Sequence, residues 1–381
     1  MSPTKRHPQA QAPEGASTKL IAFVLAAALM LLAAGSFAFI KYAQNDALSV
    51  AQRTSSYAPK TSFSTGDSPF FAQGSAPTSP ASYSLTLTFV GDCTLGTDEA
   101  FGYATGLPAY YDEEGPDYFL EGVRPLFEAD DLTIVNMEGT FTHESAREYK
   151  EFAFKAPPEY ASILSGSSVE LANLANNHSS DYGQQSYHDT IDALEGAGIR
   201  SFGYERTQVL EVNGVKVGFV GSYALAGEWY AAEILSEGIE QVKQQGAQVI
   251  IVTVHWGEEK HYYPSSSQVS LAHLAIDEGA DLVVGHHPHV FQGQETYQGK
   301  QIIYSLGNFC FGGNRNPYDM DAIIYQQTFT LDAGQIKTYD DYQIIPCSTS
   351  SREDYNDYRP RILEGSEGER VLAKYHELRV D

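Results

Sequence analysis

The chain contains one stretch in which an apolar segment stops abruptly at a glycine and three histidines, namely Asp281-Leu-Val-Val-Gly-His-His-Pro-His-Val290. Residues 282–284 are typical of a short buried strand, and Gly285 ends that strand at the edge where α/β sheets usually keep their functional groups. Neutral imidazole is the commonest protein ligand for borderline metals. A histidine-rich surface loop would have the same composition. The stretch therefore predicts an α/β sheet with either a metal site or a polar loop at its edge.

Strand and helix patterns alternate along the rest of the chain. Residues 83–90 alternate in polarity as a strand does, and further strands are predicted at 132–135, 169–174, 215–220, 249–254 and 301–305. Helical spacing is found at 186–197, 232–245 and 267–279. This order predicts an α/β domain over residues 83–347 with largely parallel strands. The charged segment 348–381 is expected to be a peripheral tail with a helix at 367–378.

The N-terminal part of the chain has the pattern of a membrane anchor. Residues 20–40 carry no charged side chain, and at about 1.5 Å per residue they would span a hydrocarbon core of about 30 Å. Because Lys5, Arg6 and Lys19 precede this run, residues 1–19 are predicted to be cytoplasmic and the rest extracellular. A cleaved signal peptide is the alternative. Residues 41–82, rich in Ser, Ala, Thr and Pro, are expected to form a flexible linker.

Size, charge and cysteine content limit the possible functions. A length of 381 residues leaves room for one large domain or two ordinary ones beside an anchor. The formal charge of −25 argues against nucleic acid as a partner, since that ligand needs a basic surface. The cysteines at 93, 310 and 347 have no close metal-binding spacing and indicate no disulfide framework, although a Cys310–Cys347 bridge remains open.

Polar residues follow several predicted strands at the point where each strand ends. These residues are Asp92, Glu138, the pair Asn177-His178, His255 and the histidine cluster at 286–289. Carboxylate, amide oxygen and imidazole together are the ligands of Mn, Fe or Zn sites, and a carboxylate shared between two ions would form a two-metal clamp. The sequence therefore predicts one or two divalent transition metals in a crevice at the strand ends.

Each of these residues also has a purely structural interpretation. Asp92 has the position of a helix cap or turn residue, and Glu138 that of an exposed turn residue. Asn177 and His178 could satisfy buried backbone groups, and His255 could pack against its neighbour in the core. The metal interpretation is favoured because all of them fall at strand ends.

The motifs in this order resemble those of the CapA family, the poly-γ-glutamate capsule biosynthesis proteins also called PgsA. The resemblance covers residues 83–347 and is carried by Gly91-Asp92-Cys-Thr-Leu-Gly96, Asn136-Met-Glu138, Ala175-Asn-Asn-His178, His255-Trp-Gly257, Gly285-His-His-Pro-His289 and Tyr304-Ser-Leu-Gly-Asn-Phe309. That family is in turn similar to the calcineurin-like metallophosphoesterases. The resemblance implies a metallophosphoesterase-like, four-layer α/β/β/α sandwich.

The same resemblance implies roles for individual residues. Asp92 would bind one metal, Glu138 would bridge two, and the second metal would be bound by Asn177 and His255. His287 and His289 would match a final His-x-His pair, with His286 as the alternative register, and His178 would be the catalytic acid. Thr94 stands where such enzymes usually have a histidine, which puts hydrolytic activity in doubt. Substrate contacts are predicted for Asn136, Lys155 and Arg315.

The expected function is that of a membrane-anchored extracellular protein in the biosynthesis, export or attachment of poly-γ-glutamate or a related anionic polymer. Metal-assisted hydrolysis or transfer would be its chemistry, and a membrane-embedded polymer synthetase complex its partner. One alternative is a metal-dependent phosphoesterase of the cell envelope. Another is a non-catalytic module that binds the polymer or the synthetase.

Overall fold

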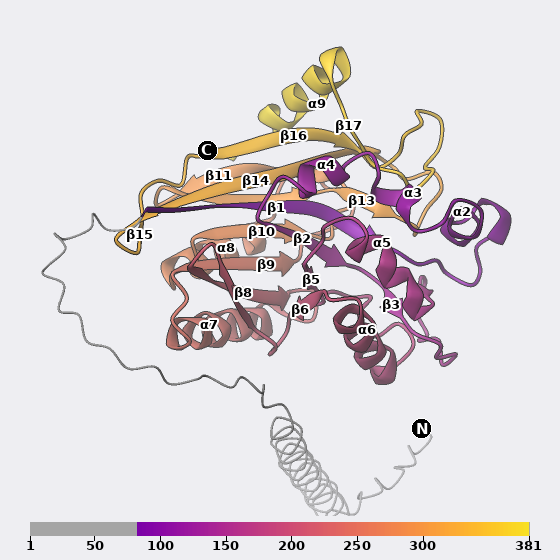
Figure 1. Cartoon of the computed structure of the whole chain (residues 1–381), viewed down its shortest axis with the longest axis horizontal. Coiled ribbons are helices and arrows are strands. Elements are labelled where there is room, and N and C mark those ends of the chain that lie inside the picture. Colours follow the sequence, from indigo (N-terminus) through magenta and orange to yellow (C-terminus); the bar gives the residue numbers. More distant parts are fainter. Residues whose placement is uncertain (1–81, 381) are drawn as a thin grey trace, which may run out of the picture. The chain divides into compact units, whose positions relative to one another are not determined.

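A computed structural model describes residues 82–380 of the chain (Figure 1). The predicted cytoplasmic segment 1–19, the anchor 20–40 and all but the last residue of the linker 41–82 lie outside the described residues. Among residues 82–380, the helices are too short or too polar to cross a bilayer.

The larger of two main sheets contains nine strands within the described residues. Its main order is β17-β16-β14-β1-β2-β5-β6, while β13 pairs with β1 and β15 with β14. β1, β2, β5, β6 and β13 run parallel to their neighbours in this group, whereas β14 and β16 are antiparallel. The strands are β1 (Ser82–Thr94), β2 (Leu132–Met137), β5 (Leu171–Asn173), β6 (Arg200–Phe202), β13 (Asn308–Phe311), β14 (Asp321–Asp332), β15 (Gln335–Ile336), β16 (Tyr342–Ser348) and β17 (Arg361–Ile362).

The second main sheet has the order β11-β12-β10-β9-β8-β7. Its central strands are parallel, and both edge strands are antiparallel. The strands are β7 (Gln208–Val212), β8 (Val215–Tyr223), β9 (Val249–His255), β10 (Leu282–His286), β11 (Phe291–Tyr297) and β12 (Lys300–Leu306). Every residue of β9 and β10 is buried, because both faces of the sheet are covered. A separate pair of short strands, β3 (Thr140–Phe141) and β4 (Lys155–Ala156), lies beside the larger sheet.

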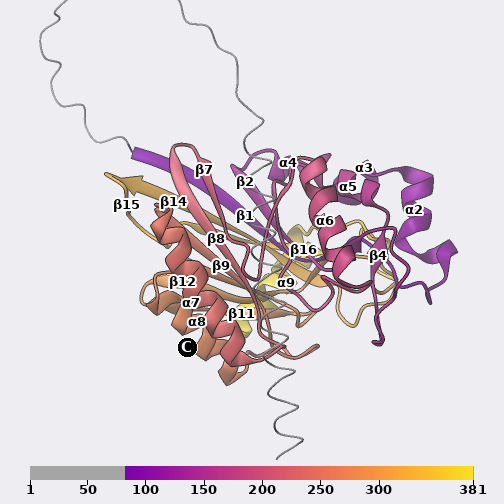
Figure 2. The same ribbon diagram turned by 90° about the horizontal axis from the view of Figure 1, so that it is seen from below.

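The two sheets pack face to face, and helices cover their outer faces. Leu87 of β1, Phe219 of β8 and Ile251 of β9 belong to one apolar cluster between the sheets. A second cluster joins the outer face of the larger sheet to α2 (Leu107–Glu114), α3 (Asp117–Leu120), α4 (Arg124–Phe127), α5 (Ala161–Ser165) and α6 (Gln184–Gly196). A third joins the smaller sheet to α7 (Glu228–Gln244) and α8 (Ser266–Asp277), which lie side by side in Figure 2. The α/β prediction is therefore confirmed, and the layers follow the order α/β/β/α.

The prediction of largely parallel strands is only partly right, because several neighbouring strands are joined by tight turns. β7 and β8 are connected through Asn213 and Gly214, which both have positive φ angles, 50° and 78°. Two such residues form the turn that suits the twist of a β-hairpin, and a hairpin is necessarily antiparallel. Two-residue connections also join β11 to β12 and β14 to β15.

The C-terminal segment is part of the folded domain, which corrects the prediction of a peripheral tail from residue 348. Helix α9 (Gly365–Glu377) packs against β16 and β11. Its buried residues Val371 and Tyr375, followed by Leu378, repeat at helical spacing and join the cluster between the sheets. The ring of Tyr375 meets that of Phe291 edge-on, with centroids 5.7 Å apart.

Residues 76–381 form one compact unit of the chain. The apolar clusters of the described residues, both main sheets and their covering helices all lie within it. Because these clusters consist of residues of this unit, it is expected to fold alone and is the natural fragment for solution work.

Tyr375→Ala tests the inclusion of the C-terminal helix in the core. Loss of a buried ring should lower the free energy of unfolding by about 3 to 5 kcal/mol, measured by urea denaturation of fragment 76–381. Glu369→Ala, an exposed position on the same helix, is the control and should change stability by less than about 0.5 kcal/mol. Equal stability of the two variants would mean that the helix is peripheral.

Candidate metal centre

Strands of both sheets end at a common site. Asp92 lies near the end of β1 and Glu138 directly follows β2, while His255 and His286 are the last residues of β9 and β10. The strand registers align these ends, because His255 pairs with His286 across the smaller sheet and Asp92 pairs with Asn308 across the larger one. The crevice at the strand ends that the sequence predicts is therefore formed by both sheets together.

Two groups of side chains at this site have the geometry of metal ligands. One consists of Asp92, Glu138 and His289, and the other of Glu138, His255 and His287. Within each group the ligand atoms lie within 4.8 Å of one another. Glu138 belongs to both groups, so its carboxylate stands where a ligand shared by two ions would be placed.

The environment of Glu138 fits a bound cation. The side chain is fully buried, and neither carboxylate oxygen accepts a hydrogen bond from any described residue. Its Oε1 lies 3.7 Å from Nε2 of both His255 and His289, and 3.9 Å from Nε2 of His178. Burial raises the pKa of Glu138 to about 8. A buried carboxylate without donors is costly, and a cation would supply the missing interaction.

The histidines of the second group are suited to bind a metal in their neutral form. Burial holds the pKa of His255 well below its usual range and lowers that of His287 to about 4. The Nδ1 atom of His287 is buried and has no hydrogen-bond partner among the described residues. Asn177, predicted to join this group, lies beside it, with Oδ1 2.7 Å from Nε2 of His255.

The first group is held together by charge. Burial alone would lower the pKa of His289, but the carboxylates of Glu138 and Asp92 outweigh it and raise the pKa to about 10. Burial would raise the pKa of Asp92, yet contacts with His286 and His289 keep it well below the usual range. His289 Nδ1 lies 3.3 Å from Asp92 Oδ2. A metal ion bound by this group would displace a proton from the His289 imidazolium.

An irregular turn directs the last two histidines into the site. His287 and His289 have φ angles of 99° and 55°, which are uncommon for residues other than glycine and are often found at functional sites. Gly285 allows β10 to lie close to β12, because a Cβ atom at Gly285 would lie 2.1 Å from the carbonyl oxygen of Tyr304. His286 Nδ1 lies 3.3 Å from Asp92 Oδ1 and belongs to neither ligand group, which favours the register of His287 and His289.

Asn136, for which a substrate contact is predicted, contacts a candidate metal ligand in the structure. It is fully buried, and its Nδ2 donates to Asp92 Oδ1 at 2.9 Å. Its Oδ1 accepts from Asn173 Nδ2 at 2.9 Å. Asn308, not singled out from the sequence although it lies in the quoted motif at 304–309, holds His289 in a similar way, with Oδ1 2.9 Å from its Nδ1.

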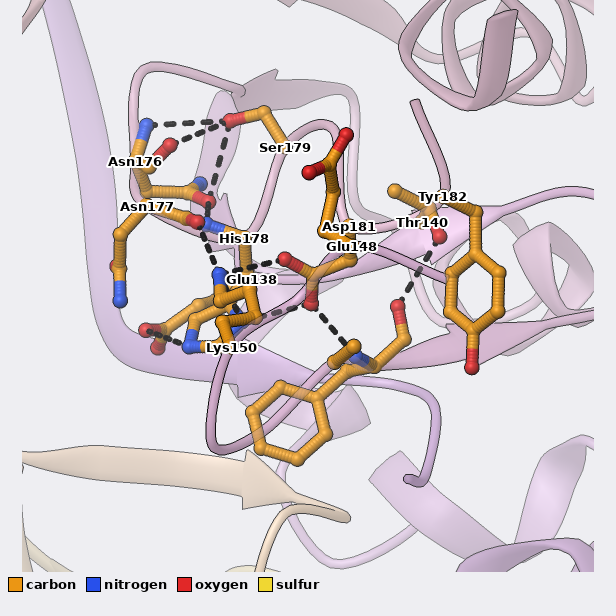
Figure 3. Close-up of polar contacts among 12 residues, drawn as sticks. Glu138, Thr140, Glu148, Lys150, Asn176, Asn177, His178, Ser179, Asp181 and Tyr182 are labelled. Carbon is orange, nitrogen blue, oxygen red and sulfur yellow. Dashed lines mark hydrogen bonds and ion pairs between the residues drawn. The ribbon is translucent and has the colours of Figure 1, made fainter. Parts of the chain in front are cut away.

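His178 is held by a carboxylate and a lysine (Figure 3). Its Nδ1 lies 2.7 Å from Asp181 Oδ2, and Lys150 Nζ donates to Asp181 Oδ1 at 2.7 Å and to the carbonyl oxygen of Asn177 at 2.6 Å. Burial lowers the pKa of His178 although Asp181 acts in the opposite direction. Because Nδ1 faces Asp181, Nε2 points toward Glu138.

Lys155 and Arg315, for which substrate contacts are predicted, lie outside the two ligand groups. Lys155 Nζ donates to the carbonyl oxygen of Glu144 at 2.7 Å and lies over the ring of Tyr182. Arg315 donates to the carbonyl oxygen of Thr105 at 3.1 Å and lies over the ring of Tyr355. Each lines a cavity away from the ligand groups. The lysine at the site is Lys150, which no sequence motif marks because it lies in an irregular segment.

Thr94 stays a departure from the metallophosphoesterase pattern in the structure. It is fully buried at the end of β1, and its hydroxyl has no hydrogen-bond partner among the described residues. The first ligand group therefore relies on Asp92, Glu138 and His289.

The fold and the site together define the class of this protein. It is a two-sheet α/β sandwich with a candidate two-metal centre, formed by carboxylates and imidazoles at its strand ends. The family described as "Bacterial capsule synthesis protein PGA_cap" matches residues 86–313, and the chain belongs to this family. It is 32% identical over 249 residues to the "PGA biosynthesis protein CapA" of Bacillus subtilis, which covers 60% of this chain and 63% of the relative.

Two further relatives carry related names. The "Capsule biosynthesis protein CapA" of Bacillus anthracis is 32% identical over 254 residues, which is 60% of each chain. A "Probable polyglutamine synthesis accessory protein" of Mycobacterium tuberculosis is 30% identical over 47% of this chain and 55% of its own length. The chain thus spans about three-fifths of the length of the two Bacillus relatives.

Glu138→Gln tests the unpartnered buried carboxylate in the metal-free protein. The folded-state pKa of about 8 lies above the ordinary value of 4.5, so the protonated group contributes stability that is complete below about pH 4.5 and lost as the pH rises through about 8. The variant lacks the titration of this carboxyl group. We expect it to gain about 1 to 3 kcal/mol over the parent between pH 5 and pH 8.5, measured by urea unfolding with a chelator present.

Glu258→Gln, an exposed carboxylate after β9, is the control for this experiment and should show no such gain. A pH-independent difference between Glu138→Gln and the parent would contradict the proposed state of Glu138.

Proposed function

We propose that the chain carries a two-metal centre of the metallophosphoesterase type and uses it in capsule polymer synthesis. The observation that carries this proposal is the carboxylate of Glu138, which is shared by two ligand groups and has no hydrogen-bond donor among the described residues. A site built for hydrogen bonding alone would not leave such a group unpaired.

Different residues would bind the two ions of such a centre. Asp92 and His289 would hold one ion, His255, His287 and Asn177 the other, and Glu138 would contact both. Divalent Mn, Fe or Zn bound there would supply Lewis acidity toward a phosphoryl or acyl oxygen and activation of water. Asn136 and Asn308 keep Asp92 and His289 oriented through their amide groups.

His178 is placed to move a proton. The Nδ1 atom of His178 contacts Asp181, so Nε2 is the atom that faces the candidate metal ligands. Lys150 fixes both Asp181 and the backbone at Asn177, which limits rotation of the imidazole. The lowered pKa of His178 makes its protonated form a ready donor to a departing group.

The relatives support the proposed polymer, and the sequence supports the proposed location. Relatives named for PGA, capsule and polyglutamine synthesis support a role in making, exporting or attaching poly-γ-glutamate or a related anionic polymer. We further propose an uncleaved anchor at 20–40, an extracellular domain and a membrane-embedded synthetase as partner.

An alkaline wash of membranes tests the proposed anchor. The full chain should stay with the membranes through this wash, which should release fragment 76–381.

A non-catalytic module is the second candidate, and Thr94 is the observation that favours it. Without an imidazole at this position the first ligand group has one strong nitrogen ligand. A binding module would keep its affinity for the polymer or the synthetase after loss of His178.

Hydrolysis of an aryl phosphodiester separates these two candidates. Fragment 76–381 with added manganese should turn over bis(p-nitrophenyl) phosphate, and His178→Asn should lower kcat by about 10²- to 10⁴-fold while the metal content stays constant. His188→Asn, an exposed histidine of α6, is the matched control and should keep full activity. Metal-loaded parent protein without turnover would contradict the catalytic proposal and favour the binding module.

A further inference from the structure

The candidate metal centre borders a cavity whose wall is mostly aromatic. The cavity has a volume of about 280 Å³, and His178, His289 and Asn308 form the part of its lining that belongs to the site. The remaining lining includes the rings of Phe101, Phe152, Phe154, Phe311 and Tyr318. A cavity of about 150 Å³ is enough for one benzene ring, so this one has room for a ring-sized group beside a phosphoryl group.

Aromatic rings of the cavity pack against His178 and His289. The ring of Phe154 lies 4.6 Å from that of His178, and Phe152 stacks parallel to Phe154 with centroids 6.2 Å apart. On the other side, Phe311 lies 5.2 Å from His289. A group attached to the reacting atom would therefore lie between two aromatic surfaces.

The charges of the cavity do not suit an anionic group. Apart from the histidines, the charged residues among its lining are Glu259 and Lys260, both exposed and of opposite sign. Lys150, a half-buried cation nearby, is already engaged by Asp181 and the carbonyl oxygen of Asn177. A carboxylate placed in the cavity would lose hydration, and the lysine of its lining, Lys260, is exposed and lies next to the opposite charge of Glu259.

We propose that the centre acts on a phosphoester in which a group attached to the phosphoryl centre is uncharged and apolar. This aromatic cavity is the subsite for that group. The inference rests on the proposed function, since it places the phosphoryl group at the metal ligands. It excludes the anionic polymer itself as the group bound beside His178.

Gly313 offers a direct way to fill the cavity. A Cβ atom there would lie 2.8 Å from the tip of the Phe311 ring and 3.0 Å from that of Phe154. The φ angle of Gly313 is not in the left-handed region, so a side chain there causes no backbone strain. The side chain is accommodated when the tips of the two phenylalanine rings move. Gly313→Val should therefore narrow the subsite and leave the metal ligands in place.

Phosphonate binding to manganese-loaded fragment 76–381 tests this subsite by calorimetry. Phenylphosphonate should bind at least about tenfold more tightly than methylphosphonate, because its ring leaves water. Hexylphosphonate should share part of this gain, and 2-carboxyethylphosphonate should show none. Gly313→Val should abolish the preference for phenyl and keep the affinity for methylphosphonate. The control is Gly196→Val, at the end of α6, where a Cβ meets nothing within 4 Å.

The outcomes distinguish this inference from the proposed function. Binding of methylphosphonate without any preference for phenyl overturns the subsite and leaves the metal centre standing. A preference for phenyl that survives Gly313→Val places the apolar contact elsewhere and also overturns the subsite. Failure of the loaded protein to bind any phosphonate overturns both proposals.

Discussion

The burial of the Glu138 carboxylate among three imidazoles is the constraint on which the rest of this site depends. Both oxygens lie out of reach of water and accept no hydrogen bond from the described residues. Burial is the main cause that raises the pKa of the group to about 8; the charge of His289 opposes this effect and that of Asp92 adds to it. A bound cation would remove this cost, which supports the proposed metal centre.

The two-sheet sandwich explains how such a group is held. Each sheet contributes strands whose carboxyl ends meet at one edge, so that Asp92 and Glu138 come from the larger sheet and His255 and the 286–289 turn from the smaller one. The clusters between and outside the sheets fix these ends against each other. The candidate ligands therefore lie at the ends of strands or in the turns that directly follow them, while Lys150 and Phe152 come from an irregular segment near the cavity.

The sequence allowed the ligands to be predicted because each polar residue follows an apolar strand, as with Glu138 after 132–137 and His255 at the end of 249–255. The α/β class followed from the same alternation. The inward orientation of Asn136, the role of Lys150 and the packing of Tyr375 depend on contacts between residues far apart in the chain. Periodicity within a segment carries no information about such partners, which is why the packing of the C-terminal segment was predicted wrongly.

The most direct test of the account is the metal content of purified fragment 76–381, measured by elemental analysis after equilibration with manganese or zinc and removal of the excess. The account predicts about two equivalents in the parent and a clear loss in the double variant His287→Ala/His289→Ala. The matched control His273→Ala/His376→Ala removes two histidines outside the ligand groups and should retain the metal. A folded parent that holds no metal, or a double variant that holds as much as the parent, would contradict the central claim.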